Sequence, residues 1–129
     1  METASGQRIT CGIIEKAAIQ RQLIKGYIAR MPELELSWEA EFQETSYACF
    51  EAHVPDLLFI SLRQLPVEVV PLLRPILTYH PGIILTTGYY LKEIGELPFP
   101  FVAYLQKPFS FEMFATSVNC YKHLNNIGS

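Results

Sequence analysis

The stretch that decides the fold is Pro55-Asp56-Leu57-Leu58-Phe59-Ile60-Ser61-Leu62-Arg63-Gln64-Leu65-Pro66. Its four consecutive apolar residues, Leu57 to Ile60, do not alternate with polar ones, which is typical of a parallel strand covered on both faces. Ser61 is the first polar residue after this run, and we expect it at the carboxyl end of the strand. Because ligands bind at the carboxyl ends of strands in open α/β sheets, the residue at position 61 bears directly on function.

Four further segments have the composition of strands. One of them alternates Leu34, Leu36 and Trp38 with polar and charged residues, which indicates an edge strand with one buried face. The strands expected around the central one are Ile9–Ile14, Leu34–Ala40, Ile83–Thr86 and Phe101–Leu105.

Five segments between and after the strands predict helices. The first carries apolar residues at helical spacing, from Ile19 to Met31, and Pro32 ends it. Pro71 and Pro75 fall in the third helix, and because an interior proline removes a backbone hydrogen bond, this helix should be short or kinked. The expected helices are Ala17–Met31, Thr45–His53, a segment from Pro71 to Tyr79, the short Tyr89–Ile94, and Phe111–Leu124 with Ser110 as its N-cap.

Strands that alternate with helices predict a parallel sheet with helices on both faces. Right-handed crossovers leave few topologies, and the best match is a flavodoxin-like (βα)5 doubly wound sheet with strand order 2-1-3-4-5. The 129 residues suit one domain spanning 1–129, with an ordered core at about 9–124.

Composition narrows the function classes. The net charge is −3 with basic residues scattered, which argues against direct nucleic-acid binding. No apolar run is long enough to cross a membrane, and widely spaced cysteines are typical of reduced thiols in a cytoplasmic protein: Cys11, Cys49 and Cys120. The histidines are isolated, are expected at the surface and predict no metal site: His53, His80 and His123.

From Ile9 to Leu124 the order of elements and three motifs resemble the receiver domain of two-component response regulators. The closest resemblance is to receivers of LytTR-type regulators, which carry a separate DNA-binding domain after the receiver. The motifs are Pro55-Asp56-Leu57-Leu58-Phe59-Ile60-Ser61 with Pro66 as the loop proline, Ile83-Ile84-Leu85-Thr86-Thr87-Gly88-Tyr89, and Val102-Ala103-Tyr104-Leu105-Gln106-Lys107-Pro108-Phe109.

The resemblance implies a role for each matching position. Ser61 stands at the phosphoacceptor position, Thr87 at the switch hydroxyl, Tyr104 at the switch aromatic residue and Lys107 at the lysine that contacts phosphate. The family also implies a cis peptide bond between Lys107 and Pro108.

Two departures from the family pattern change the expected chemistry. Family members have an aspartate where this chain has Ser61, and a pair of acidic residues where it has Glu15 and Lys16. Mg²⁺ prefers carboxylate oxygens in an octahedral shell, and the ammonium groups of Lys16 and Lys107 would repel it. Asp56 is no substitute, because five residues along a strand place it about 16 Å away. We therefore expect no metal, no cofactor and no aspartyl phosphate.

An ion pair offers a replacement for the metal. Lys16 or Lys107 could pair with Glu15 while Ser61 donates a hydrogen bond, which gives a degenerate phosphoacceptor pocket. Two readings remain open for this pocket: its residues are structural remnants, or Lys16, Lys107 and nearby backbone N–H groups bind an anion. The pocket residues are Glu15, Lys16, Ser61, Thr87 and Lys107.

Half of the aromatic side chains of the chain fall between Tyr89 and Phe114. The resemblance implies that a receiver docks its partners through the fourth helix, fifth strand and fifth helix, so exposed members of this set would form a patch for a protein partner or a homodimer. Burial of most of them in the core is the open alternative. The candidate interface residues are Tyr89, Tyr90, Ile94, Phe99 and Phe101.

These observations together predict a non-enzymatic signalling module that acts by protein contacts, alone or before a separate output domain. The alternative is a small enzyme or an anion- or nucleotide-binding protein on the same fold. The first strand-to-helix turn, Ile14-Glu15-Lys16-Ala17-Ala18, lacks the glycines of a dinucleotide site. Ser61 also lacks the glycines of a nucleophile elbow.

Overall fold

The computed structural model describes residues 8–62, 65 and 67–127. It contains one five-stranded parallel sheet in the order β2-β1-β3-β4-β5, which confirms the predicted flavodoxin-like topology. The strands are β1 (Ile9–Ile14), β2 (Leu34–Ala40), β3 (Leu57–Leu62), β4 (Ile83–Thr87) and β5 (Ala103–Gln106). Pro66, the expected loop proline, lies outside the described residues.

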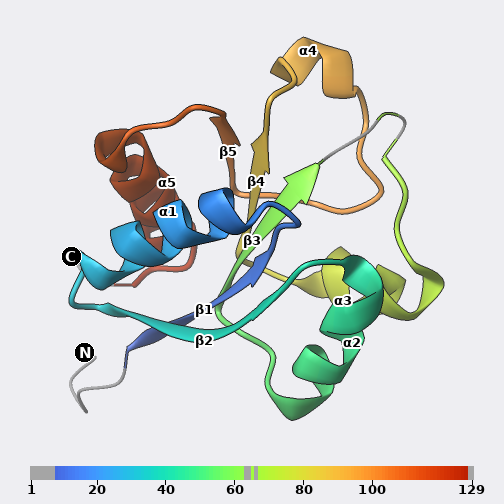
Figure 1. Ribbon diagram of the computed structural model, residues 1–129, viewed down its shortest axis with the longest axis horizontal. Helices are drawn as coiled ribbons and strands as arrows, with labels where there is room; N and C mark the ends of the chain where they lie inside the picture. Colours follow the sequence, from blue (N-terminus) through green and yellow to red (C-terminus); the bar gives the residue numbers. More distant parts are fainter. Residues whose placement is uncertain (1–7, 63–64, 66, 128–129) are drawn as a thin grey trace.

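Helices cover both faces of the sheet (Figure 1). On one face lie α1 (Ala18–Ala29) and α5 (Phe111–Leu124), and on the other α2 (Gln43–Ala52), a 3₁₀ turn η1 (Pro71–Leu73) and α3 (Arg74–Tyr79). The short α4 (Leu91–Ile94) stands near the carboxyl ends of the strands. Each face has its own apolar core, since Phe59 packs with Phe114 of α5 while Ile60 belongs to the cluster that contains Leu77 of α3.

The two prolines of the third helix act as predicted. Pro71 begins the 3₁₀ turn, and Pro75 is the second residue of α3, where a missing N–H leaves no helical hydrogen bond unmade. The helix is therefore short. At α5 the predicted cap is also present, because Ser110 Oγ accepts a hydrogen bond from Met113 N at 3.2 Å.

The bounds of β3, β4 and β5 differ from the expectation. β3 continues to Leu62, so Ser61 lies inside the strand, because Leu62 is also buried and pairs with Thr87. β4 ends at Thr87 and β5 at Gln106, each one residue later than expected. β5 begins at Ala103 rather than at Phe101, which is exposed and follows Pro100.

Two side chains are placed differently from the prediction. His80 was expected at the surface, and this is wrong: it is buried, and its ring bonds the main chain on both sides. Its Nδ1 accepts from Gly82 N at 3.0 Å, so its Nε2 donates to Pro55 O at 2.7 Å. Ile19, on the predicted buried stripe of the first helix, is exposed in the first turn of α1, whose buried residues are Ile24 and Ile28.

None of the described helices combines the length and the apolar character needed to cross a bilayer. The described residues also contain no group of three histidine, cysteine or acidic side chains placed to hold a metal ion.

Candidate functional site

Four polar residues meet at the carboxyl edge of the sheet, on the face that α1 and α5 cover. Side chains alternate along a strand, and the residues two positions earlier on these four segments pack in the core beneath α1 and α5: Ile13, Phe59, Ile84 and Leu105. The next residues on the same face form what we call the edge cluster: Glu15, Ser61, Thr86 and Lys107. Register pairs Ser61 of β3 directly with Thr86 of β4.

Glu15 is the buried acid of the edge cluster, with 3% of its surface exposed. Its Oε1 lies 2.7 Å from Lys107 Nζ, and its Oε2 accepts a hydrogen bond from Ala17 N at 2.9 Å. Both carboxylate oxygens therefore have partners within the chain.

Lys107 joins Glu15 to Ser61. Its Nζ donates to Ser61 Oγ at 3.0 Å. Since an ammonium has no acceptor, Ser61 accepts this hydrogen bond, and the expectation that Ser61 donates to the ion pair is wrong. The Lys107–Pro108 peptide bond is cis, as the resemblance implies.

Lys16 does not take part in the pair. Its side chain is exposed and forms no ion pair with any described residue, while its main-chain carbonyl accepts from Arg21 Nη1 at 2.8 Å. Of the two lysines considered for the pair with Glu15, the structure brings Lys107 to it.

The two threonines at the end of β4 face opposite sides. Thr87 Oγ1 donates to Leu62 O and accepts from Tyr89 N, both at 3.1 Å, so this hydroxyl lies away from Ser61. Thr86 is fully buried beside Ser61, and its Oγ1 has no hydrogen-bond partner among the described residues. Sequence reasoning missed Thr86. Counting the alternation backward from Thr87 to Ile84 could have found it.

Tyr104 also lies on the face away from the edge cluster. Its hydroxyl donates to the main-chain carbonyl of Tyr89, which ties β5 to the segment before α4. Burial, with smaller contributions from Glu93 and Tyr90, raises the pKa of the Tyr104 phenol above its ordinary value. The phenol therefore stays protonated and keeps donating at neutral pH.

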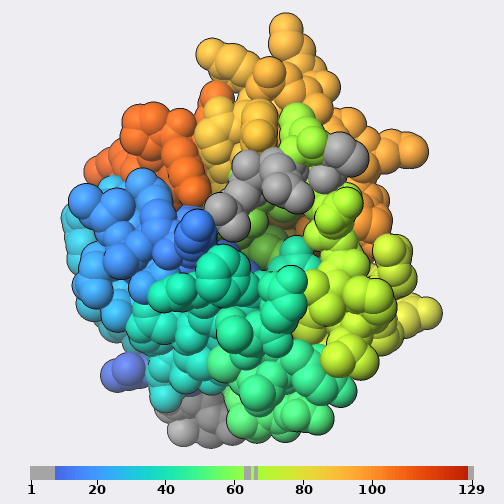
Figure 2. Space-filling model, turned by 45° about the vertical axis from the view of Figure 1, so that its right-hand side comes forward, coloured from blue at the N-terminus to red at the C-terminus, as the bar shows by residue number. Residues whose placement is uncertain are grey.

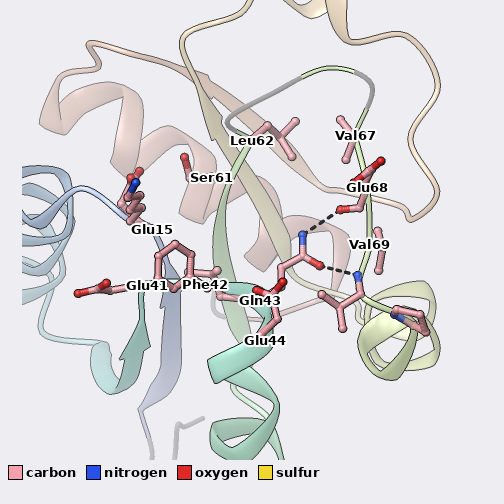
Figure 3. A pocket seen from close by; sticks show the side chains of 14 residues that line it. Glu15, Glu41, Phe42, Gln43, Glu44, Ser61, Leu62, Val67, Glu68 and Val69 are labelled. Atoms are coloured by element: carbon pink, nitrogen blue, oxygen red, sulfur yellow. Dashed lines mark hydrogen bonds between the residues drawn. The ribbon is translucent and has the colours of Figure 1, made fainter.

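A cavity of about 430 Å³ opens beside Ser61 and Glu15. Figure 3 shows Phe42 between these residues and Gln43, whose side-chain amide reaches the segment that follows β3. Gln43 Nε2 donates to Glu68 O at 3.0 Å, and Gln43 Oε1 accepts from Val70 N at 2.8 Å. Glu68 and Val70 therefore form a wall of the cavity that the Gln43 side chain holds by two hydrogen bonds.

Only part of the candidate interface is at the surface. Tyr90 is 59% exposed and Phe101 38% exposed, and Tyr89 is half-buried. Ile94 and Phe99 are buried in the core under α2 and α3, which corrects their assignment to the interface, because α4 turns its apolar residue back onto the sheet. In the space-filling view the yellow-orange residues around α4 project from the upper end of the molecule (Figure 2).

No protein-family model matches the chain, and no curated protein matches it either. Solved structures do resemble it. The PhyR receiver domain of Erythrobacter litoralis superposes with a TM-score of 0.75 at 16% identity, covering 98% of each chain. The response regulatory domain of mrkE from Klebsiella pneumoniae gives 0.69 at 15% identity, covering 91% of this chain and 95% of the other.

A variant of the anti-anti-sigma factor PhyR from Bartonella quintana gives a TM-score of 0.74 at 17% identity, covering 98% of this chain and 55% of the other. The chain thus spans about half the length of that protein. At such identities the likeness concerns the fold, which is that of a response-regulator receiver domain.

Proposed function

We propose that this chain is an atypical receiver-like signalling domain of two-component signal transduction, one that acts by protein–protein contact without phosphorylation on aspartate. The observation that carries the proposal is the position of Lys107 Nζ, 2.7 Å from Glu15 Oε1 and 3.0 Å from Ser61 Oγ. The resemblance implies a lysine at this position as well, but beside acids that bind a metal and accept phosphate, whereas here the ammonium meets one carboxylate and one hydroxyl.

The residues present do not fit Mg²⁺. This ion demands near-ideal octahedral coordination by oxygen, provided in proteins by carboxylates. Glu15 is the one acid of the edge cluster, and both of its oxygens already have partners. An exposed lysine, Lys16, follows it, and Ser61 offers a hydroxyl that already accepts from Lys107. We therefore assign no metal and no cofactor to the domain.

The output of such a domain would be a surface. Tyr90, Leu91 and Phe101 are exposed apolar residues at the start of α4 and between α4 and β5, and we call these three residues the α4 patch. We assign to it a protein partner or a second copy of the chain, because exposed aromatic residues are enriched at interfaces. A LytTR-type DNA-binding domain would lie outside this chain. The net charge of −3 is consistent with a cytoplasmic domain that binds neither nucleic acid nor a membrane.

An enzyme on the same fold is the second candidate, favoured by the cavity beside Ser61. A nucleophilic serine needs a neighbouring base to take its proton. The basic group that contacts Ser61 is Lys107, which pairs with Glu15 and donates a hydrogen bond to the Ser61 hydroxyl. This arrangement cannot activate the hydroxyl, so the signalling function is supported better. A large rise in melting temperature with nucleotides, flavins or acyl phosphates would favour the enzyme instead.

The test is intact mass after incubation with an acyl phosphate and Mg²⁺. We expect no phosphoryl adduct on the wild-type chain. The Lys16→Asp/Ser61→Asp variant, which regains both missing acids, serves as the control and should acquire one phosphoryl group. A stoichiometric adduct on the wild-type chain at Ser61 or elsewhere in the edge cluster would refute the proposed function.

A further inference from the structure

The turn between β1 and α1 is held by a second cation of the chain. Arg21 Nη1 donates to Glu15 O and to Lys16 O, both at 2.8 Å. Neither carbonyl belongs to the hydrogen-bond ladder of α1, whose first bonds run from Gln20 N and Arg21 N to Ala17 O. One guanidinium nitrogen thus ties together two carbonyls that the helix leaves free.

The other side of the same guanidinium is anchored to β2. Arg21 Nε lies 3.0 Å from Glu39 Oε1, and Lys25 Nζ lies 2.8 Å from Glu39 Oε2. Hydrogen bonding to Lys25 holds the pKa of Glu39 below its ordinary value, with Arg21 adding to the effect, so Glu39 stays ionised at neutral pH. Glu39 pairs with Ile13 in register, which fixes Arg21 over the end of β1.

Two cations therefore converge on Glu15 from different sides. Lys107 binds its carboxylate, and Arg21 binds its main-chain carbonyl. The second carboxylate oxygen accepts from Ala17 N, which belongs to the turn that Arg21 closes. The direction of the Glu15 side chain thus depends on the conformation that Arg21 fixes.

We propose that Arg21 is a positioning residue for the edge cluster: it holds the turn at residues 15–17 in the conformation in which Glu15 meets Lys107. This role rests on the proposed function, in which cations of the chain itself, and no metal ion, hold the residues of the edge cluster in place. A lysine could not replace Arg21, because only a planar fork of donors reaches two carbonyls and a carboxylate at once.

The test compares Arg21→Gln with the matched control Lys25→Gln in metal-free protein. Both variants remove one positive charge from α1 and one contact with Glu39, but only Arg21 touches the turn. In Arg21→Gln we expect the Ala17 amide to exchange about tenfold faster and the carboxyl ¹³C resonance of Glu15 at pH 7 to move, because bonds to a charged donor are lost. In Lys25→Gln the resonance should stay in place and the exchange rate should stay within about twofold of wild type.

Equal effects of the two substitutions, or no change at Ala17 and Glu15 in Arg21→Gln, would overturn the proposal. Arg21→Lys is the milder second variant, and it should resemble Arg21→Gln at Ala17. Full rescue by lysine would show that charge alone suffices and would also overturn it. The measurement is independent of the proposed function, because uptake of phosphoryl or Mg²⁺ by wild type would refute that function and leave the Ala17 comparison intact.

Discussion

Lys107 and Glu15 form the one pair in which a described acid is almost fully buried. Removing one partner of a buried pair leaves an uncompensated charge. We therefore expect Lys107→Met to lower the free energy of unfolding by about 3 kcal/mol, at the lower end of the range for buried pairs because the lysine is partly exposed. Urea unfolding at pH 7 measures the loss of stability. The m-value should stay the same as in wild type, which would show that the substitution leaves the compactness of the folded and unfolded states unchanged.

The double variant Glu15→Gln/Lys107→Met is the control for this prediction. It removes the buried charge together with its partner, so it should be more stable than Lys107→Met alone. A double variant at least as unstable as the single one would mean that lost packing, and not the isolated charge, causes the effect.

His80 gives the protein a pH dependence whose sign follows from its hydrogen bonds. Burial lowers the pKa of His80 below the ordinary value of 6.5, although Pro55 O and Asp56 oppose the shift. A proton on Nδ1 would also point at the N–H of Gly82. Nearby Tyr121, whose pKa burial raises to about 12, stays neutral. The unfolded state therefore binds a proton on His80 more readily than the folded state does. The free energy of unfolding should be highest above pH 6.5 and should decrease as the pH falls below 6.5.

Unfolding free energies of wild type, His80→Gln and His123→Gln between pH 5 and pH 8 check this, which is about the range over which histidine changes charge. His123 is exposed and serves as the matched control. His80→Gln should flatten the dependence near pH 6, whatever its overall stability, while His123→Gln keeps the wild-type slope. A slope unchanged in His80→Gln would contradict the assignment.

Among the individual residues of the site, the sequence predicts the positions of some correctly and misplaces others. Spacing within motifs assigns Ser61 and Lys107 to the ends of β3 and β5, and the structure brings them within hydrogen-bond distance across β4. Thr87 is assigned in place of Thr86 because two consecutive hydroxyls differ only in the face they occupy, and a shift of one residue exchanges the faces. The direction of the Ser61 hydrogen bond depends on whether its partner is Glu15 or Lys107, which the pattern does not give.

Among the elements, α2 holds the chain at Glu68 and Val70, which lies between β3 and η1. Gln43 at the start of α2 makes two hydrogen bonds to the main chain of Glu68 and Val70. In Gln43→Leu we expect the Val70 amide to lose its exchange protection and the free energy of unfolding to fall by about 1–2 kcal/mol, because both bonds are lost. Hydrogen exchange followed by NMR measures the amide.

The neighbouring Glu44→Gln is the control, since Glu44 is exposed and lines the same cavity without bonding this segment. It should leave Val70 unchanged. Equal exchange rates at Val70 in wild type and Gln43→Leu would show that the wall of the cavity is held by other contacts.

The strength of the periodic signal decides which elements the sequence predicts well. β1 and β2 have the predicted bounds, because their apolar patterns end at polar residues or turns. β5 begins two residues after its predicted start. The apolar Phe101 is typical of a strand, but Pro98 and Pro100 favour an irregular connection before it. The short α4 has four residues, about one turn, so its pattern could not show that Ile94 faces inward.

For the whole molecule, the strand order could be predicted because parallel strands joined by right-handed crossovers allow few arrangements. The surface could not, since exposure depends on how α4 packs over the ends of β4 and β5. Ile94 and Phe99 are buried for this reason, whereas Tyr90, of similar apolar character, projects from the molecule.

The α4 patch predicts behaviour in solution. If a second copy covers it, the molar mass of wild type measured by light scattering should rise with concentration, and Tyr90→Lys should stay monomeric because a charge would be buried at the contact. Tyr79→Lys is the matched control, since Tyr79 is 84% exposed on α3, away from α4. A constant monomeric mass for wild type would leave the patch to a different protein, and equal association of the two variants would contradict its role.

We propose that Lys107 neutralises Glu15 at the carboxyl edge of the sheet and that no divalent metal binds there. The most direct test is a Mg²⁺ titration followed by amide NMR, with Lys16→Asp/Ser61→Asp as the control that regains the missing acids. We expect no saturable shift at Glu15, Ser61 or Lys107 in wild type and clear saturation in the variant. Saturable Mg²⁺ binding at these residues in wild type would contradict it.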